Sequence, residues 1–164
     1  MPVLDHTIVT AHDNQRSARF VADILGLAAP ITLGPFAIVR VGEFTTLDFV
    51  QIDGPVTSQH YAFLVTEAEF DDIFGRIRAQ DLPYWADPHH DEPGRINTWD
   101  GGRGVYWDDP DGHLLEIITR PYGTGGTTTD HPHPLVASDA SNRPAEPRSP
   151  TPPRSRAPKA SPRV

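Results

Sequence analysis

Residues 109–118 read Asp-Pro-Asp-Gly-His-Leu-Leu-Glu-Ile-Ile, a turn sequence followed by an apolar, strand-like run that contains one carboxylate, Glu116. Proline, glycine and aspartate in this order favour a tight turn, and we expect both aspartates to fix it through hydrogen bonds to nearby backbone N–H groups. An apolar segment at 104–107 precedes the turn. We therefore predict a β-hairpin with strands at 104–107 and 113–119.

Two further strand-like stretches each contain a histidine: Leu4-Asp5-His6-Thr7-Ile8-Val9 and Gln59-His60-Tyr61-Ala62-Phe63-Leu64-Val65. Together with Glu116 they offer two imidazoles and one carboxylate. Such a set holds a first-row divalent ion and leaves positions open for a substrate. We predict one divalent metal ion per site, bound by His6, His60 and Glu116. Fe, Mn, Zn, Ni and Co all suit these ligands, so the ligand types do not choose among them.

The order of the predicted elements repeats along the chain. Helices are predicted at 14–25, capped by Asp13 or Asn14 and ended by Gly26, and at 67–80. Strands are predicted at 2–10, 36–41, 45–52, 59–66, 82–85, 104–107 and 113–119. The chain thus reads strand–helix–three strands twice, in modules at about 3–52 and 57–119. Asp48 stands in the last strand of the first module, where the second module has Glu116.

The composition changes near residue 122. Of the 18 prolines, 10 lie between residues 121 and 164, a stretch rich in Thr, Ser, Arg and Ala and poor in aromatic residues. Such a stretch cannot bury enough apolar surface to offset the entropy lost on ordering. We predict one folded domain at 1–122 and a disordered Pro/Thr/Arg-rich tail at 123–164.

Charge and residue usage limit the partners. Residues 1–120 contain 8 Arg, no Lys and 19 Asp or Glu, a balance of −11, which argues against nucleic acid as the main ligand. The chain has no cysteine, so disulfides and thiolate sites are excluded. No apolar run reaches bilayer length and no signal peptide is evident, so we expect no membrane partner and a cytoplasmic protein.

These motifs resemble the vicinal oxygen chelate superfamily, which includes glyoxalase I, fosfomycin-resistance thiol transferases, extradiol dioxygenases and bleomycin-resistance proteins. The run 107–116 is similar to the closing hairpin of that family, whose Glu is the last metal ligand, and His6 and His60 match the other two ligands. The resemblance implies an α+β fold of paired βαβββ modules that form an open, curved β-sheet cup around a metal. It also implies a homodimer, often with each site shared between two chains.

Within the superfamily the resemblance places the chain only partly. Glyoxalase I has a Glu where this chain has Asp48, which could act as a base or bind through water. Tyr106 stands where the fosfomycin-resistance enzymes have a substrate-contacting Tyr, but the domain has no lysine for a phosphonate. We take Asp48 and Tyr106 as catalytic candidates.

Other polar residues have a functional and a structural interpretation. His89, His90 or His113 could supply the base histidine of extradiol dioxygenases, although we expect His113 at the surface. Arg103 could bind an anionic substrate group or lie at the surface.

The predicted function is a divalent-metal-dependent enzyme that acts on a small substrate with chelating oxygens. Lyase, isomerase or thiol-transferase chemistry of the glyoxalase kind comes first, and ring cleavage by a dioxygenase comes next. The alternative is a binding protein of the bleomycin-resistance type, which sequesters a drug or metabolite without turnover.

Overall fold

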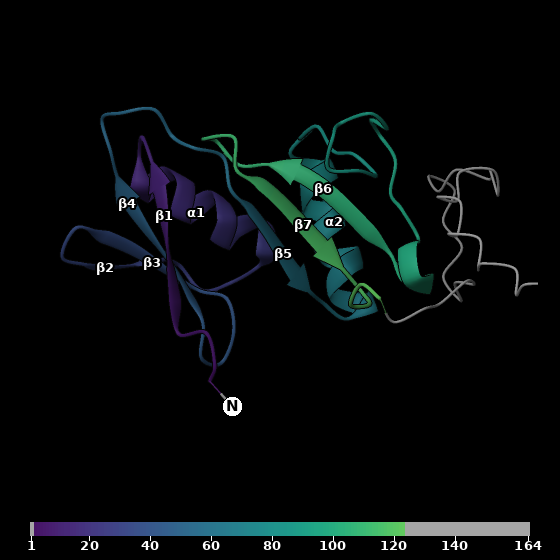
Figure 1. Ribbon diagram of the computed structural model, residues 1–164, viewed down its shortest axis with the longest axis horizontal. Helices are drawn as coiled ribbons and strands as arrows, with labels where there is room; N and C mark the ends of the chain where they lie inside the picture. Colours follow the sequence, from purple (N-terminus) through teal and green to yellow (C-terminus); the bar gives the residue numbers. More distant parts are fainter. Residues whose placement is uncertain (1, 124–164) are drawn as a thin grey trace, which may run out of the picture.

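The computed structural model describes residues 2–123; residue 1 and residues 124–164, which include nearly all of the predicted tail, lie outside the described residues. The elements in chain order are β1 (His6–Ala11), α1 (Asn14–Leu25), β2 (Ile31–Leu33), β3 (Phe36–Arg40), β4 (Thr46–Gln51), β5 (His60–Leu64), α2 (Glu67–Ala79), the 3-10 turn η1 (Trp99–Gly101), β6 (Gly104–Asp108) and β7 (Leu114–Ile118). They form an open four-stranded sheet, β1-β4-β3-β2, and an open three-stranded sheet, β5-β7-β6 (Figure 1). The predicted α+β class is confirmed.

The two sheets share one pairing scheme. The first strand of each runs parallel to the last strand, β1 with β4 and β5 with β7, and the strand before the last runs antiparallel to it. The second sheet lacks the third strand that we predicted at 82–85. Only Trp85 pairs there, through an isolated bridge to Tyr106. Pro83 has no N–H to donate, so a longer ladder cannot form on this side.

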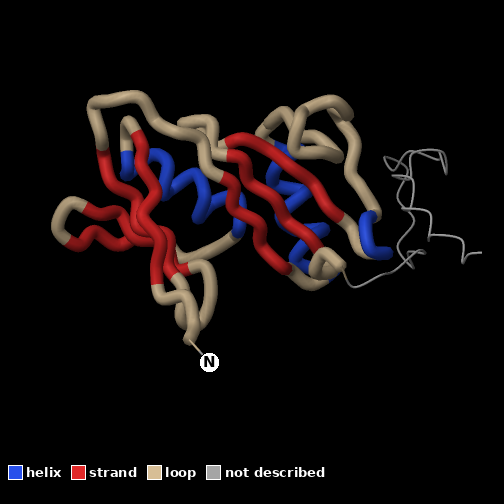
Figure 2. The backbone as a smooth tube through the Cα atoms, in the orientation of Figure 1, coloured by secondary structure: helices blue, strands red, loops and turns tan. Residues whose placement is uncertain are grey.

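Both helices begin and end at residues that the sequence marks. The side chain of Asp13 accepts a hydrogen bond from the backbone N–H of Arg16, and Gly26 ends α1 in the left-handed conformation at φ 71°. Thr66 and Glu69 form a reciprocal capping box at the start of α2. Helix α1 packs on the four-stranded sheet and touches α2 (Figure 2).

One face of each sheet is buried against the helices and the other is not. Val9 and Phe49 of the first sheet, and Trp107 and Ile117 of the second, lie in one continuous apolar core. On the opposite face, large apolar side chains are exposed in this single chain: Ile8, Ile31, Leu33 and Leu64. An uncovered apolar sheet face of this kind marks an interaction surface.

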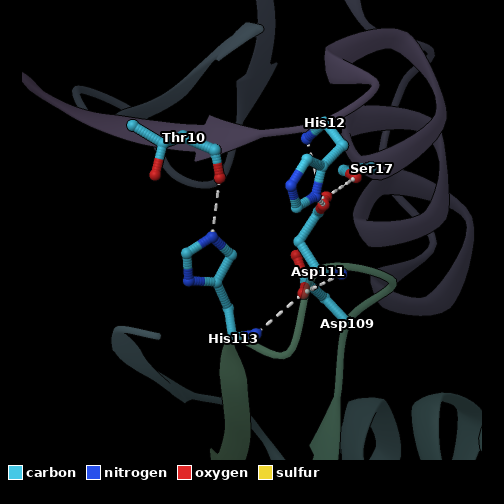
Figure 3. A network of polar contacts seen from close by, with 6 residues as sticks. All are labelled: Thr10, His12, Ser17, Asp109, Asp111 and His113. Carbon is cyan, nitrogen blue, oxygen red and sulfur yellow. Dashed lines mark hydrogen bonds and ion pairs between the residues drawn. The ribbon is translucent and has the colours of Figure 1, made fainter. Parts of the chain in front are cut away.

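The β6–β7 turn ties the second sheet to the first half of the chain (Figure 3). Asp111 accepts hydrogen bonds from the backbone N–H of His12 at 3.0 Å and from the Ser17 hydroxyl at 2.5 Å, and lies 2.7 Å from the His12 ring. Burial would raise the pKa of Asp111, but the hydrogen bonds from Ser17 and His12 outweigh it and leave the pKa below its usual value.

His113 forms the second part of this junction. Its ring accepts from the backbone N–H of Gln59 at 3.0 Å and donates from Nε2 to the carbonyl oxygen of Thr10 at 2.8 Å, which fixes the neutral Nε2–H tautomer. The expectation that His113 is a surface residue is wrong: the residue is completely buried. Asp109 fixes the turn as predicted, because it accepts from the backbone N–H groups of Asp111 and His113.

Candidate metal centre

His60 and Glu116 meet on the face of the three-stranded sheet that points away from the helices, which is open at β5 and covered by aromatic side chains at Glu116. β5 and β7 pair in parallel, with Ala62 opposite Glu116, so His60 lies one side-chain step along the same face. The ring atom Nε2 of His60 is 3.1 Å from Oε2 of Glu116, and Nδ1 is 3.1 Å from the carbonyl oxygen of Leu114. Strand register therefore places an imidazole and a carboxylate in direct contact, and these are two of the three residues predicted as metal ligands.

The contacts of His60 show that a positive charge is needed between His60 and Glu116. Both ring nitrogens of His60 face acceptors, but a neutral imidazole has only one N–H, so one of the two contacts joins two acceptors. Two acceptors in contact need a cation, either a second ring proton or a metal ion. A metal-bound histidine commonly donates its other N–H to a backbone carbonyl. Metal–ligand distances of about 2.1 Å also put neighbouring ligands of one ion roughly 3 Å apart. The donor set thus fits a divalent ion.

Glu116 is completely buried, and aromatic side chains surround it. Tyr106 lies opposite it in the β6–β7 register and stacks on His60, with ring centroids 6.0 Å apart. Tyr122, just after β7, donates a short hydrogen bond to Oε1 of Glu116, and the hydroxyls of Tyr122 and Tyr106 are 2.7 Å apart. Burial first, and then the Glu116 carboxylate, raise the pKa of both phenols. Both therefore remain protonated donors at neutral pH.

Tyr122 was not among the residues predicted from the sequence. It lies six residues beyond Glu116, past the last strand, where strand periodicity carries no information. Its only sequence signal is that it is the last aromatic residue before the proline-rich stretch. Trp99 is the third aromatic side chain of this group, and its ring centroid lies 6.0 Å from that of Tyr122 and 6.3 Å from that of Tyr106.

The other two predicted residues lie on the first sheet and not beside His60. His6 is half-exposed and bonds Oδ2 of Asp5 at 2.8 Å, and this hydrogen bond raises the pKa of His6. Asp48 accepts from the Thr46 hydroxyl at 2.7 Å. Residues 2–123 contain no group of three or more His, Asp or Glu side chains placed to hold one metal ion. A single chain therefore presents His60 with Glu116, and His6 separately.

The remaining candidates have structural partners. Arg103 is buried and donates to Glu67 and Asp71, both at 2.6 Å, with its guanidinium 4.3 Å from the Phe70 ring centroid. These contacts hold α2 to the second sheet, so the guanidinium is already satisfied. His90 stacks on Trp85 with ring centroids 3.8 Å apart, which orders the loop before β6.

Known proteins share this arrangement of elements. No family model matches the sequence. The chain is 27% identical over 120 residues to glutathione transferase FosA of Serratia marcescens, covering 70% of this chain and 78% of that protein. Among solved structures, oxidase ChaP-H1 is 64% identical, with 75% of this chain and 99% of that chain covered and a TM-score of 0.73. Oxidase ChaP-H2 is 58% identical, with 76% and 98% covered and a TM-score of 0.74.

The chain belongs to the vicinal oxygen chelate superfamily. The resemblance read from the 107–116 hairpin is confirmed. Neither helix of residues 2–123, of 12 and 13 residues, has the length or hydropathy of a membrane span.

Proposed function

We propose that this vicinal oxygen chelate protein is a divalent-metal-dependent enzyme whose ion is held by His60 and Glu116 of one chain and His6 of a second copy. The observation that carries the proposal is the 3.1 Å contact of His60 Nε2 with Oε2 of the completely buried Glu116, made by a ring whose two nitrogens both face acceptors. Burying a carboxylate without a matching positive charge is costly, and a divalent ion supplies that charge.

A second copy accounts for the position of His6. Residues His6 and Ile8 of β1 alternate with buried Val9 and Ala11, so they belong to the uncovered face of the first sheet. The uncovered face of the second sheet contains His60 and exposed Leu64. A homodimer with two-fold symmetry that joins these faces buries both apolar surfaces and completes two equal sites. Asp48, which lies on the β4 face next to β1, would come to the site together with His6.

The ion would act as a Lewis acid on neighbouring oxygens of a small substrate. The chain's own residues supply the rest: Tyr106 lies on the same face as the ligands, and its phenol oxygen, whose proton goes to Tyr122, orients a substrate hydroxyl by accepting from it. Asp48 is the candidate proton acceptor. The buried surroundings of Glu116 exclude water on one side of the site. Fe, Mn, Zn, Ni and Co all remain compatible with these ligands.

We further propose that the reaction is an oxidation with dioxygen as the oxidant. Two proteins named as oxidases match this chain at 64% and 58% identity over nearly their whole length. The protein named as a glutathione transferase matches at 27%. The domain also has no lysine, which weakens the case for the phosphonate substrate of the fosfomycin-resistance enzymes. Oxidation therefore ranks above the lyase and transferase reactions that motifs alone favour.

The first experiment measures bound metal in wild type, Glu116→Ala and His60→Ala, purified without chelator or a histidine tag and reconstituted with each candidate ion. His89→Ala, a loop histidine whose side chain touches neither ligand, is the matched control. We expect about one ion per chain in wild type and control and almost none in the two ligand variants, because each loses a protein ligand. A wild type that binds no ion would overturn the proposal and favour metal-free sequestration of a ligand.

The shared site is tested by mixing chains. His6→Ala keeps His60 and Glu116, whereas Glu116→Ala keeps His6, so each variant alone lacks a complete site. A mixed dimer contains one complete site and one doubly defective site. We expect metal binding and oxygen uptake with small catechol-like compounds to reappear on mixing. Two variants that stay inactive when mixed, while each remains dimeric and folded, would contradict the shared site.

A further inference from the structure

The two oxygens of Glu116 have different neighbours. Oε2 lies 3.1 Å from His60 Nε2, whereas Oε1 accepts a hydrogen bond from the Tyr122 hydroxyl. A strong donor on one carboxylate oxygen uses one of its lone pairs and favours the other oxygen as the one that an ion approaches. The side chain is therefore oriented before any ligand arrives, and Tyr122 is the group that orients it.

The phenol of Tyr122 is itself held in place. Its proton goes to Glu116, so its oxygen accepts from the Tyr106 hydroxyl at 2.7 Å. The Trp99 ring packs on it at 6.0 Å between centroids, and the next residue, Gly123, donates its backbone N–H to Asp100 at 3.1 Å. Contacts from β6 and from the η1 turn thus fix a side chain that is itself half-exposed and lies beyond the last strand.

We propose that Tyr122 is a positioning residue for the metal ligand: its phenol, supported by Tyr106, holds Oε1 of Glu116 so that Oε2 alone faces the ion beside His60. This inference rests on the proposed function. It assigns the segment after β7 a role at the site. One-oxygen binding by Glu116 also leaves more of the coordination sphere free for two substrate oxygens.

The test is Co²⁺ binding by the full chain, followed by calorimetry and by the visible absorption of the bound ion. Outer hydrogen bonds to metal ligands are worth about 10–100-fold in metal affinity. We expect Tyr122→Phe to lose that much affinity and to change the absorption spectrum, because Glu116 can then bind through both oxygens. Tyr61→Phe is the matched control: that phenol donates to Gln59 at 2.6 Å and belongs to the other face of β5.

The outcomes separate this inference from the proposed function. If Glu116→Ala abolishes binding and Tyr122→Phe binds Co²⁺ with the affinity and spectrum of wild type, the inference fails and the proposed function stands. If Glu116→Ala binds Co²⁺ as wild type does, the proposed function fails. Should Tyr122→Phe not fold, Tyr106→Phe decides, since it removes the support of Tyr122 and leaves its ring: unchanged affinity and spectrum would overturn the inference.

Discussion

The two sheets of this protein contain a histidine and a carboxylate at equivalent positions, but these residues differ in burial and in hydrogen-bond partners. In the three-stranded sheet, Glu116 is completely buried and both of its oxygens have partners, one of them His60. In the four-stranded sheet, Asp48 and His6 stand at the matching places, but His6 is half-exposed and bonds its own neighbour, Asp5. The same topology therefore surrounds one carboxylate with fixed partners and leaves the other with few. The difference teaches that burial and hydrogen bonding, and not the place in the repeat alone, distinguish Glu116 from Asp48 in the site that we propose.

The largest expected effect is on metal affinity, when each of the two carboxylates is removed in turn. Glu116→Ala removes the buried ligand, and we expect metal affinity to fall by more than about 100-fold, since one of three protein ligands is lost. Asp48→Ala removes a half-buried carboxylate whose hydrogen-bond donor among residues 2–123 is the nearby Thr46 hydroxyl. We expect it to change affinity by less than about 3-fold, the size of a weak outer contact. Calorimetric titration with Co²⁺ measures both.

Equal losses of metal affinity in the two variants would contradict this comparison, because they would indicate that Asp48 is a fourth ligand. Asp48→Glu then serves as the follow-up, since it restores the longer side chain that glyoxalase I has at this place. Tighter binding in Asp48→Glu than in wild type would sharpen the contrast, because it would show that one methylene separates this chain from a four-ligand site.

The next largest effect concerns the junction that joins the two halves. His113→Ala leaves the Gln59 N–H and the Thr10 carbonyl oxygen without their side-chain partner and opens a cavity in a completely buried place. We expect the free energy of unfolding to fall by about 2–4 kcal/mol. His12→Ala removes an exposed ring from the same junction, and we expect a loss below about 1 kcal/mol. Urea unfolding measures both, and similar losses would contradict the assignment of His113 as the central residue.

Much of this architecture could be predicted because its signals are local. Asp13, Gly26 and the Thr66–Glu69 pair mark helix ends within a few residues, and alternation marks the strands. The contact of His60 with Glu116 followed from one parallel register. The burial of His113 could not be predicted in this way, because its partner Thr10 lies 103 residues away in sequence. The same turn sequence is compatible with a solvent-facing turn and with a buried junction between modules, so the sequence does not choose between them.

The separation of His6 from His60 has a related cause. Equivalent positions in the two modules predict equivalent roles, but they do not show whether the two sheet faces meet within one chain or between two copies of the chain. The role of Tyr122 was missed because it follows the last strand, where no period constrains a side chain. Pro83 shows the reverse case: one residue in an apolar run reduced a predicted strand to isolated bridges at Trp85. Contacts of the Tyr122 side chain and the missing N–H of Pro83, rather than periodicity, decided the last two outcomes.

The smallest expected effect is a pH dependence that compares the two aspartates of the β6–β7 turn. Because the folded-state pKa of Asp111 lies below its usual value, its stabilising hydrogen bonds are fully present above about pH 4 and are lost as the pH falls through the folded pKa. Asp109 is shifted the other way, since burial raises its pKa. We expect Asp111→Asn to cost on the order of 1 kcal/mol at pH 7, and this difference from wild type to shrink as the pH falls below about 4 and through the folded pKa of Asp111. Asp109→Asn is expected to become less costly, relative to wild type, as the pH rises, because it removes a carboxyl group that burial disfavours in its charged form. Urea unfolding at pH 7, 5 and 3 measures the free energy of unfolding of both variants, and Asp53→Asn, at an exposed residue, is the control. If the two turn variants show parallel pH profiles, the hydrogen bonds from Ser17 and His12 do not distinguish Asp111 from Asp109.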